Sequence, residues 1–126
     1  MYNEIVLDHY KHPRNHRAMK NPDATSRVGS PICGDVMEFY IKVKKINGKD
    51  IIEDISFETF GCAASVAVGS MITELLKGKS LEEAEKLTDS DVNAKLGGLP
   101  EVKHHCANLG LSALHEAIKN YKNKKK

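Results

Sequence analysis

The sequence predicts one α+β domain, in which helices pack on one face of a three-stranded antiparallel sheet and the last helix is long. Two neighbouring segments alternate apolar and polar residues on either side of an Asn-Gly pair, which is typical of a β-hairpin. Two later segments repeat apolar residues at helical spacing. The chain has 126 residues, 40% hydrophobic and 29% charged, as expected for one soluble globular domain. We therefore expect a single domain over residues 1–126, with 122–126 as a disordered tail.

The amino-terminal part is expected to form a short helix followed by a loop-rich connection. Residues 11–31 contain several proline, asparagine and glycine residues, which favour turns. Within this connection, residues 25–28 are a candidate edge strand of the sheet.

A hairpin forms the centre of the predicted sheet. Residues 36–43 and 51–60 both alternate, and the Asn-Gly pair between them can adopt the positive φ of a tight turn. Residues that face each other across an antiparallel pair must share a face of the sheet. This condition favours pairing Phe39 with Phe57, and it fixes the register of the whole hairpin.

The same register predicts what meets at the open end of the hairpin. Cys33 would lie beside Ala63 and Asp35 beside Gly61, with Cys62 within one residue of both. Two thiols and a carboxylate therefore converge there, and an error of one or two residues in the turn would not separate them.

Three helical segments are expected between the hairpin and the last helix. Residues 63–77 carry an apolar stripe at helical spacing and are followed by a glycine that can end a helix. Ser-Leu-Glu-Glu at 80–83 is a capping box that opens another short helix, and a further short turn lies at 91–96. The last helix should begin after Pro100 and run to about Tyr121, with a stripe formed by Cys106, Leu109, Ala113, Ala117, Ile118 and Tyr121.

Cys106 would lie in the first turns of this last helix. There the unpaired backbone N–H groups and the helix dipole favour an anion. We therefore expect the Cys106 thiol to have a lowered pKa and to form a thiolate readily.

Bulk properties exclude several functional classes. The formal charge is only +2 and lysines gather in the tail, which argues against nucleic-acid binding. No apolar run is long enough to cross a bilayer, so we expect no membrane association and a cytoplasmic location. Three cysteines cannot all pair within one chain, and a reducing cytoplasm disfavours disulfides. Metal binding or thiol chemistry is then the leading explanation, with small buried hydrophobic side chains as the alternative.

The residues around the cysteines favour a metal site that can release its guest. Cys33, Asp35, Cys62, His105 and Cys106 supply three thiolates, a carboxylate and an imidazole. Thiolates suit zinc and iron–sulfur clusters, whereas a carboxylate or imidazole holds less firmly than a fourth cysteine. On a helix, the side chain of His104 would point about 100° away from that of His105. The remaining histidines have no thiol neighbours and are expected to be structural or solvated: His9, His12, His16 and His115.

Four segments carry distinctive patterns: YNEIVLDHYKHPRN at 2–15, ICGDVM at 32–37, TFGCAAS at 59–65 and LPEVKHHC at 99–106. Together they resemble those of IscU-type iron–sulfur scaffolds, the family that also forms the amino-terminal domain of NifU proteins. The resemblance implies a stoichiometric scaffold rather than an enzyme. Such a scaffold assembles [2Fe-2S] clusters from Fe²⁺ and persulfide sulfur and transfers them to acceptor proteins.

The resemblance also implies roles for single residues. The positions that match cluster and metal ligands are Cys33, Asp35, Cys62, His105 and Cys106. Asp35 matches the aspartate associated with cluster lability, and Cys106 the cysteine that accepts persulfide sulfur from a cysteine desulfurase. Lys103 matches a lysine near the site, to which we assign an electrostatic role. Tyr2 matches a tyrosine implicated in the association of two scaffolds.

The partners implied are a cysteine desulfurase of the IscS or NifS type, a ferredoxin-type electron donor, apo iron–sulfur acceptor proteins and a second copy of the chain. Glu101 stands where the family has a second proline, which argues against recognition by a dedicated chaperone. An alternative is a zinc-binding sulfur acceptor of the SufU type. The short separation of Cys62 from Cys106 and the presence of His105 argue against it, although Zn²⁺ suits the same ligands in purified protein.

Overall fold

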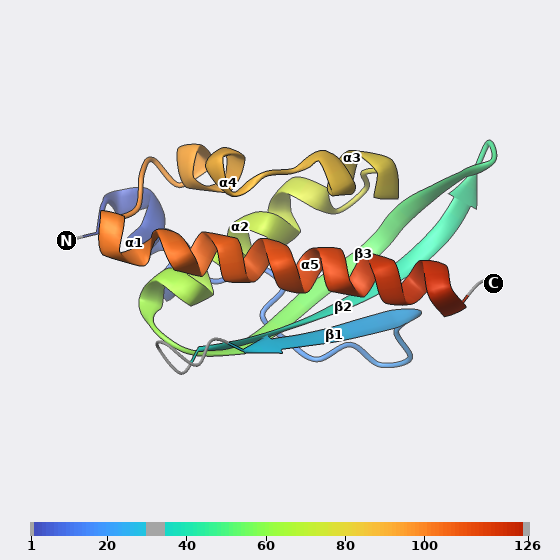
Figure 1. Cartoon of the computed structure of the whole chain (residues 1–126), viewed down its shortest axis with the longest axis horizontal. Coiled ribbons are helices and arrows are strands. Elements are labelled where there is room, and N and C mark those ends of the chain that lie inside the picture. The colour runs from blue at the N-terminus through green and yellow to red at the C-terminus, as the bar shows by residue number, and fades with distance from the viewer. Residues whose placement is uncertain (1, 30–34, 125–126) are drawn as a thin grey trace.

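The computed structural model describes residues 2–29 and 35–124, apart from the side chain of Val102. Its elements, in chain order, are α1 (Glu4–Lys11), β1 (Ala24–Gly29), β2 (Val36–Ile46), β3 (Lys49–Phe60), α2 (Ala63–Leu76), α3 (Leu81–Lys86), α4 (Asp89–Lys95), the 3₁₀ turn η1 (Glu101–Lys103) and α5 (His104–Lys124). The strands form one sheet in the order β1-β2-β3, and α2 and α5 cover one face of it (Figure 1). The predicted α+β class and three-stranded sheet are therefore confirmed.

The hairpin has the predicted register over most of its length. Phe39 pairs with Phe57 and Ile41 with Ile55, both in antiparallel pairs. The turn uses positive φ angles of 53° at Asn47 and 79° at Gly48, as the sequence indicated. A bulge shifts the register between Lys42 and Val43, which alternation alone did not reveal.

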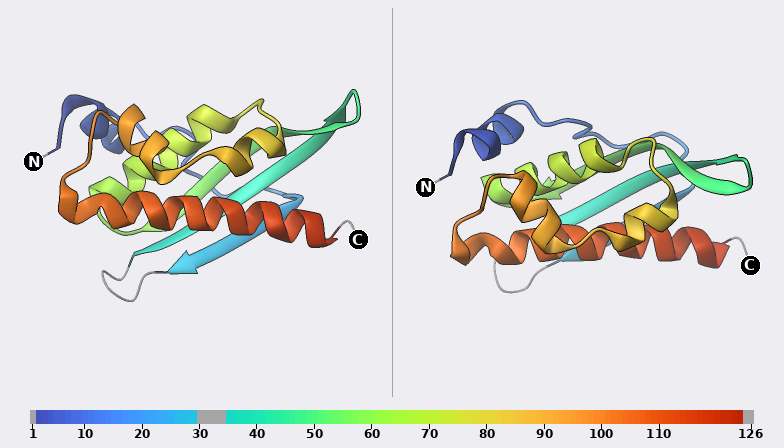
Figure 2. Two further views of the ribbon diagram at one scale, coloured as in Figure 1. Left: turned by 45° about the horizontal axis from the view of Figure 1, so that its top comes forward. Right: turned by 90° about the horizontal axis from the view of Figure 1, so that it is seen from above.

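The two rotated views in Figure 2 show the helices layered on one side of the sheet. The core side chains come from the sheet and from these helices. The largest fully buried side chains are Phe39, Phe57, Met37, Ile41, Ile52, Ile55, Ile72, Leu96, Leu114, Ile118, Val6 and Val68. Gly69 of α2 lies directly against the ring of Phe57, where a Cβ atom would overlap the ring carbons. The missing side chain at Gly69 thus allows α2 to pack close to the centre of β3. None of the described helices combines the length and the apolar character that a membrane span needs.

Helix α5 is longer than the sequence predicted. It continues through Lys124, so residues 122–124 are helical rather than part of a disordered tail. Two lysines in this last turn have partners, because Lys122 Nζ lies 2.7 Å from Glu85 Oε1 and Lys124 Nζ donates to the Asp23 carbonyl at 3.2 Å. These tertiary contacts stabilise a turn that lysine content alone suggested would fray.

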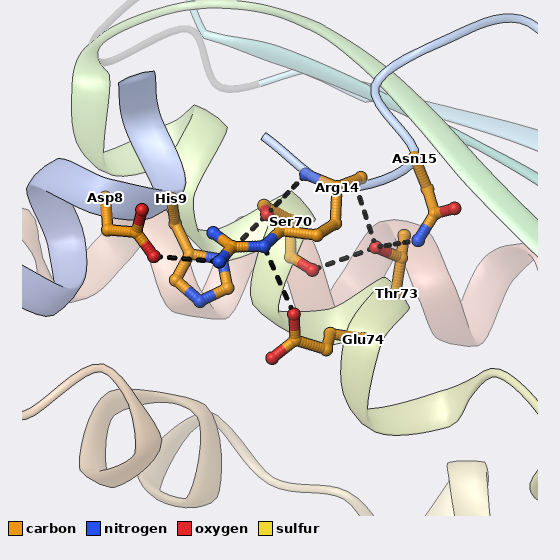
Figure 3. A network of polar contacts seen from close by, with 7 residues as sticks. All are labelled: Asp8, His9, Arg14, Asn15, Ser70, Thr73 and Glu74. Carbon is orange, nitrogen blue, oxygen red and sulfur yellow. Dashed lines mark hydrogen bonds and ion pairs between the residues drawn. The ribbon is translucent and has the colours of Figure 1, made fainter. Parts of the chain in front are cut away.

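Helix α1 is held on α2 by a polar network (Figure 3). The Ser70 hydroxyl accepts a hydrogen bond from the Arg14 backbone N–H at 2.9 Å and lies 2.7 Å from Nδ1 of the buried His9. The Arg14 guanidinium lies 2.8 Å from Asp8 of α1 and 3.3 Å from Glu74 of α2. Since the Ser70 oxygen accepts from Arg14, its own proton is available to His9 Nδ1, which suits a neutral imidazole. His9 is therefore a structural residue, as expected.

This network predicts that acid weakens the fold through His9. Burial and the Arg14 charge lower the pKa of His9 below its ordinary 6.5. Below about pH 6.5 the unfolded chain therefore binds a proton at His9 more readily than the folded chain does. The free energy of unfolding should be insensitive to this group above pH 6.5 and fall below it, by at most about 1.4 kcal/mol per pH unit. Urea unfolding between about pH 7.5 and 5.5 should show a weaker pH dependence for His9→Gln than for the wild type.

The matched control is His12→Gln, which replaces an exposed histidine just after α1. We expect this variant to keep the full pH dependence of the wild type. An unchanged pH dependence in His9→Gln would show that another group causes the loss of stability in acid.

Candidate metal centre

Three segments bring potential ligands together at one end of the sheet. Asp35 directly precedes β2, Cys62 lies between β3 and α2, and His105 and Cys106 are in the first turn of α5. The observed pairing of Val36 with Phe60 leaves Asp35 next to Gly61, as the predicted register required. The end of the hairpin therefore meets the start of α5, which the sequence argument required.

The distances confirm that these side chains form one cluster. The Sγ atoms of Cys62 and Cys106 are 3.7 Å apart, and Asp35 Oδ2 lies 3.9 Å from the first and 3.6 Å from the second. His105 Nε2 is 3.6 Å from Cys106 Sγ. One potential ligand atom each from Asp35, His105 and Cys106 all lie within 4.8 Å of one another. Cys33, the remaining predicted ligand, lies outside the described residues.

Two neighbours fix the carboxylate of Asp35, which is only 4% exposed. The Ser65 hydroxyl donates a hydrogen bond to Asp35 Oδ2 at 2.8 Å. A Cβ atom on Gly61 would come within 2.5 Å of Asp35 Oδ1, so the missing side chain leaves room for the carboxylate. Ser65 was not predicted as part of the site. It is the third residue after Cys62, the N-cap of α2, and no local pattern indicated that its hydroxyl meets Asp35.

The two described thiols differ in acidity, and the pKa of Cys106 shifts in the opposite direction to that predicted. Burial raises the pKa of Cys106 to about 12, and the negative charges of Cys62 and Asp35 act in the same direction. Burial also acts to raise the pKa of Cys62, but hydrogen bonds from Ser65 and neighbouring groups outweigh it and the pKa falls below 9.0.

The expectation of a lowered pKa at Cys106 was therefore wrong. A helix dipole contributes about 0.3–1 kcal/mol, too little to offset full burial beside a thiolate and a carboxylate. The helix-end effect falls instead on Cys62, which is the N-cap residue of α2. Burial thus favours the protonated form of the Cys106 thiol, and a cation bound to this sulfur would displace the proton.

Tyr2 and Lys103 both lie near the two thiols. The pKa of Tyr2 is raised by burial, and also by the charges of Cys62 and Cys106. The same two thiols raise the pKa of Lys103, with Cys62 contributing most, so the lysine ammonium is favoured next to the cluster. His104, in contrast, is exposed, and its Nε2 lies 3.0 Å from the Leu99 carbonyl oxygen. The predicted contrast between the adjacent histidines is consistent with this arrangement.

The described donor set suits a soft or borderline cation. Two thiols, one carboxylate and one imidazole are all ligand types that zinc and iron accept, and thiolates also hold iron–sulfur clusters. Asp35 and Cys106 are buried and Cys62 and His105 are half-buried, so a guest bound here would be partly shielded but still reachable from solvent. The carboxylate and imidazole make the site weaker than a closed four-cysteine site.

A sheet covered by helices on one face, with thiol, carboxylate and imidazole side chains gathered at one end, defines a small α+β protein with a candidate metal site. The chain belongs to the NifU-like N-terminal domain family, which it matches over residues 1–126.

The chain is also similar to curated relatives and to solved structures. It is 51% identical over 120 residues to the iron-sulfur cluster assembly scaffold protein IscU of Aquifex aeolicus, covering 95% of this chain and 75% of that protein. It is 45% identical over 127 residues to the protein of the same name from Escherichia coli K12, covering 98% and 96%. The N-terminal NifU-like protein structure from Brucella abortus matches with a TM-score of 0.74 and 21% identity over 97% of this chain and 94% of that one. This likeness supports the fold, and the sequence relatives confirm the resemblance inferred from the four segments.

Proposed function

We propose that this single-domain chain is a cytoplasmic scaffold for the assembly of [2Fe-2S] clusters. Curated relatives that are 45% and 51% identical to it are named as iron-sulfur cluster assembly scaffolds. The observation that carries the proposal is the meeting of Cys62 and Cys106 sulfurs at 3.7 Å beside Asp35 and His105. The scaffold is not an enzyme: it builds a cluster on itself and passes it to an apo iron–sulfur acceptor protein.

Assembly divides the site into an iron part and a sulfur part. Fe²⁺ binds Asp35, Cys62 and His105, and Cys33 is assigned as a further ligand. A cysteine desulfurase transfers sulfur to Cys106 as a persulfide. Two electrons, one from a ferredoxin-type donor and one from the bound Fe²⁺, then break the S–S bond and give sulfide, the Cys106 thiolate and Fe³⁺. Two iron–sulfide units combine when two copies of the chain associate, and we assign Tyr2 to that contact.

The remaining ligands set how firmly the cluster is held. Asp35 is assigned as the ligand that keeps the finished cluster labile, because a carboxylate is a harder and weaker partner for it than a fourth thiolate. Lys103 is assigned an electrostatic role, in which its ammonium offsets the negative charge that builds up on the thiolates. Zn²⁺ suits the same donor set, so purified protein is expected to carry it unless a chelator is used.

Anaerobic reconstitution tests the proposal. The wild-type chain, supplied with Fe²⁺, cysteine, a cysteine desulfurase and a reduced ferredoxin-type electron donor, should develop the visible absorption of a [2Fe-2S] cluster. If it does not, and the protein only exchanges Zn²⁺, the SufU-type sulfur acceptor is the better description.

The adjacent histidines provide a matched pair for the same experiment. His105→Ala removes an imidazole 3.6 Å from Cys106 Sγ and should weaken Fe²⁺ binding at least about 10-fold, with a matching loss of cluster yield. His104→Ala alters an exposed neighbour and should behave as the wild type. Equal effects of the two substitutions on Fe²⁺ affinity would remove His105 from the site.

A further inference from the structure

The carboxylate of Asp35 lies near both described thiols, and a residue outside the proposed ligand set contacts it. The Ser65 hydroxyl donates to Oδ2, the same oxygen that lies 3.6 Å from Cys106 Sγ and 3.9 Å from Cys62 Sγ. Ser65 is fully buried. A carboxylate oxygen has a second lone pair, so Oδ2 can accept this hydrogen bond and still bind a cation.

The backbone gives Ser65 a fixed position relative to the thiols. Ser65 lies in the first turn of α2, and its N–H donates to the carbonyl of Cys62 at 3.0 Å. One helix terminus therefore holds both a sulfur ligand and the hydroxyl that orients the carboxylate.

Gly61 lies against the Asp35 carboxylate on a second side. A Cβ atom there would lie 2.5 Å from Asp35 Oδ1, 2.7 Å from its Cγ and 3.1 Å from Ser65 Oγ. The carboxylate thus lies between the Gly61 backbone and the Ser65 hydroxyl, with little room to rotate.

We propose that Ser65 is a positioning residue that keeps Asp35 Oδ2 directed at the Cys62 and Cys106 sulfurs, so that an incoming cation meets a preformed carboxylate. This role rests on the proposed function, because the cation is the iron of the growing cluster. The shorter of the two contacts that the Ser65 hydroxyl makes with these groups is to Asp35, so its effect on the carboxylate is the stronger one. The hydroxyl is 2.8 Å from the carboxylate, a normal hydrogen bond, but 3.7 Å from Cys62 Sγ.

A double-mutant cycle on the metal-free protein tests this role with Zn²⁺ as the probe. Ser65→Ala should weaken Zn²⁺ binding about 10-fold, at the lower end of the loss seen when a partner that orients a ligand is removed. In an Asp35→Ala background the same substitution should change the affinity by less than about 2-fold, because the group on which Ser65 acts is gone. Similar losses in both backgrounds, or no loss with Asp35 present, would overturn the proposal.

Gly61→Ala gives a second, independent perturbation should Ser65→Ala fold poorly. Its methyl group would displace the carboxylate, so it should also weaken Zn²⁺ binding when Asp35 is present and have little effect when Asp35 is alanine. A loss of equal size in the Asp35→Ala background would contradict the proposed geometry.

Co²⁺ spectra separate positioning from general damage. Ser65→Ala should retain the thiolate-to-cobalt charge-transfer bands, because both sulfurs remain, and shift the d–d bands that report the oxygen ligand. Loss of the charge-transfer bands would mean that Ser65 supports the sulfurs themselves and would overturn the assignment. These titrations need no desulfurase and no cluster, so they can fail or succeed independently of the reconstitution experiment.

Discussion

Replacing Cys106 with alanine is expected to abolish the stabilisation of the folded chain by Zn²⁺. A ligand that binds only the native state, at 1,000 times its Kd, adds about 4 kcal/mol to the free energy of unfolding. Cys106 Sγ is within 3.7 Å of ligand atoms from Cys62, Asp35 and His105, so the substitution removes the sulfur that contacts all three other described ligands. Urea unfolding with Zn²⁺ and with a chelator measures the difference, which should be near zero in Cys106→Ala.

Metal-free stability provides the control for this prediction. Truncating the buried Cys106 sulfur should cost only about 1 kcal/mol without metal, so the variant remains folded and the comparison is valid. His104→Ala, which alters the same turn of α5 on its exposed side, should keep the full effect of Zn²⁺. Undiminished stabilisation of Cys106→Ala by Zn²⁺ would show that the cation binds elsewhere.

Phe57→Ala is expected to be the most destabilising of the substitutions considered, at about 3–5 kcal/mol. The ring is fully buried, lies against Gly69 and stacks on His16 with centroids 4.7 Å apart. Removing it would leave a cavity between β3 and α2 that a glycine cannot fill. The free energy of unfolding of the metal-free protein, measured in urea, checks the value.

Phe60 offers a matched control on the same strand. Its side chain is 72% exposed, so Phe60→Ala should change the free energy of unfolding by no more than about 0.5 kcal/mol. If the two substitutions had similar effects, the assignment of the sheet faces would be wrong.

The sheet could be predicted from sequence because its main determinant is local. Alternation with period two decides which residues share a face, and facing residues such as Phe39 and Phe57 then fix the register. The bulge after Lys42 could not be predicted from alternation. Whether a strand takes one extra residue at a given point depends on how the sheet twists under its helices. The same register carried Asp35 to Gly61, which is why this half of the site could be predicted.

The acidity of the thiols could not be predicted, because it depends on contacts between distant segments. Cys106 lies 44 residues from Cys62 and 71 from Asp35, and the burial and charge that these contacts create outweigh the local helix dipole. Ser65 was missed for a related reason. Its role becomes visible only when Asp35, 30 residues earlier, is placed over it.

The spread of the ligands along the chain has a consequence for synthesis. The ribosome makes Asp35 and Cys62 well before Cys106, and amino-terminal segments start to fold first. A nascent chain that has not yet produced α5 therefore lacks both Cys106 and its neighbour His105. The thiol assigned to accept persulfide sulfur is made last among the proposed ligands, so sulfur delivery follows the synthesis of the final helix.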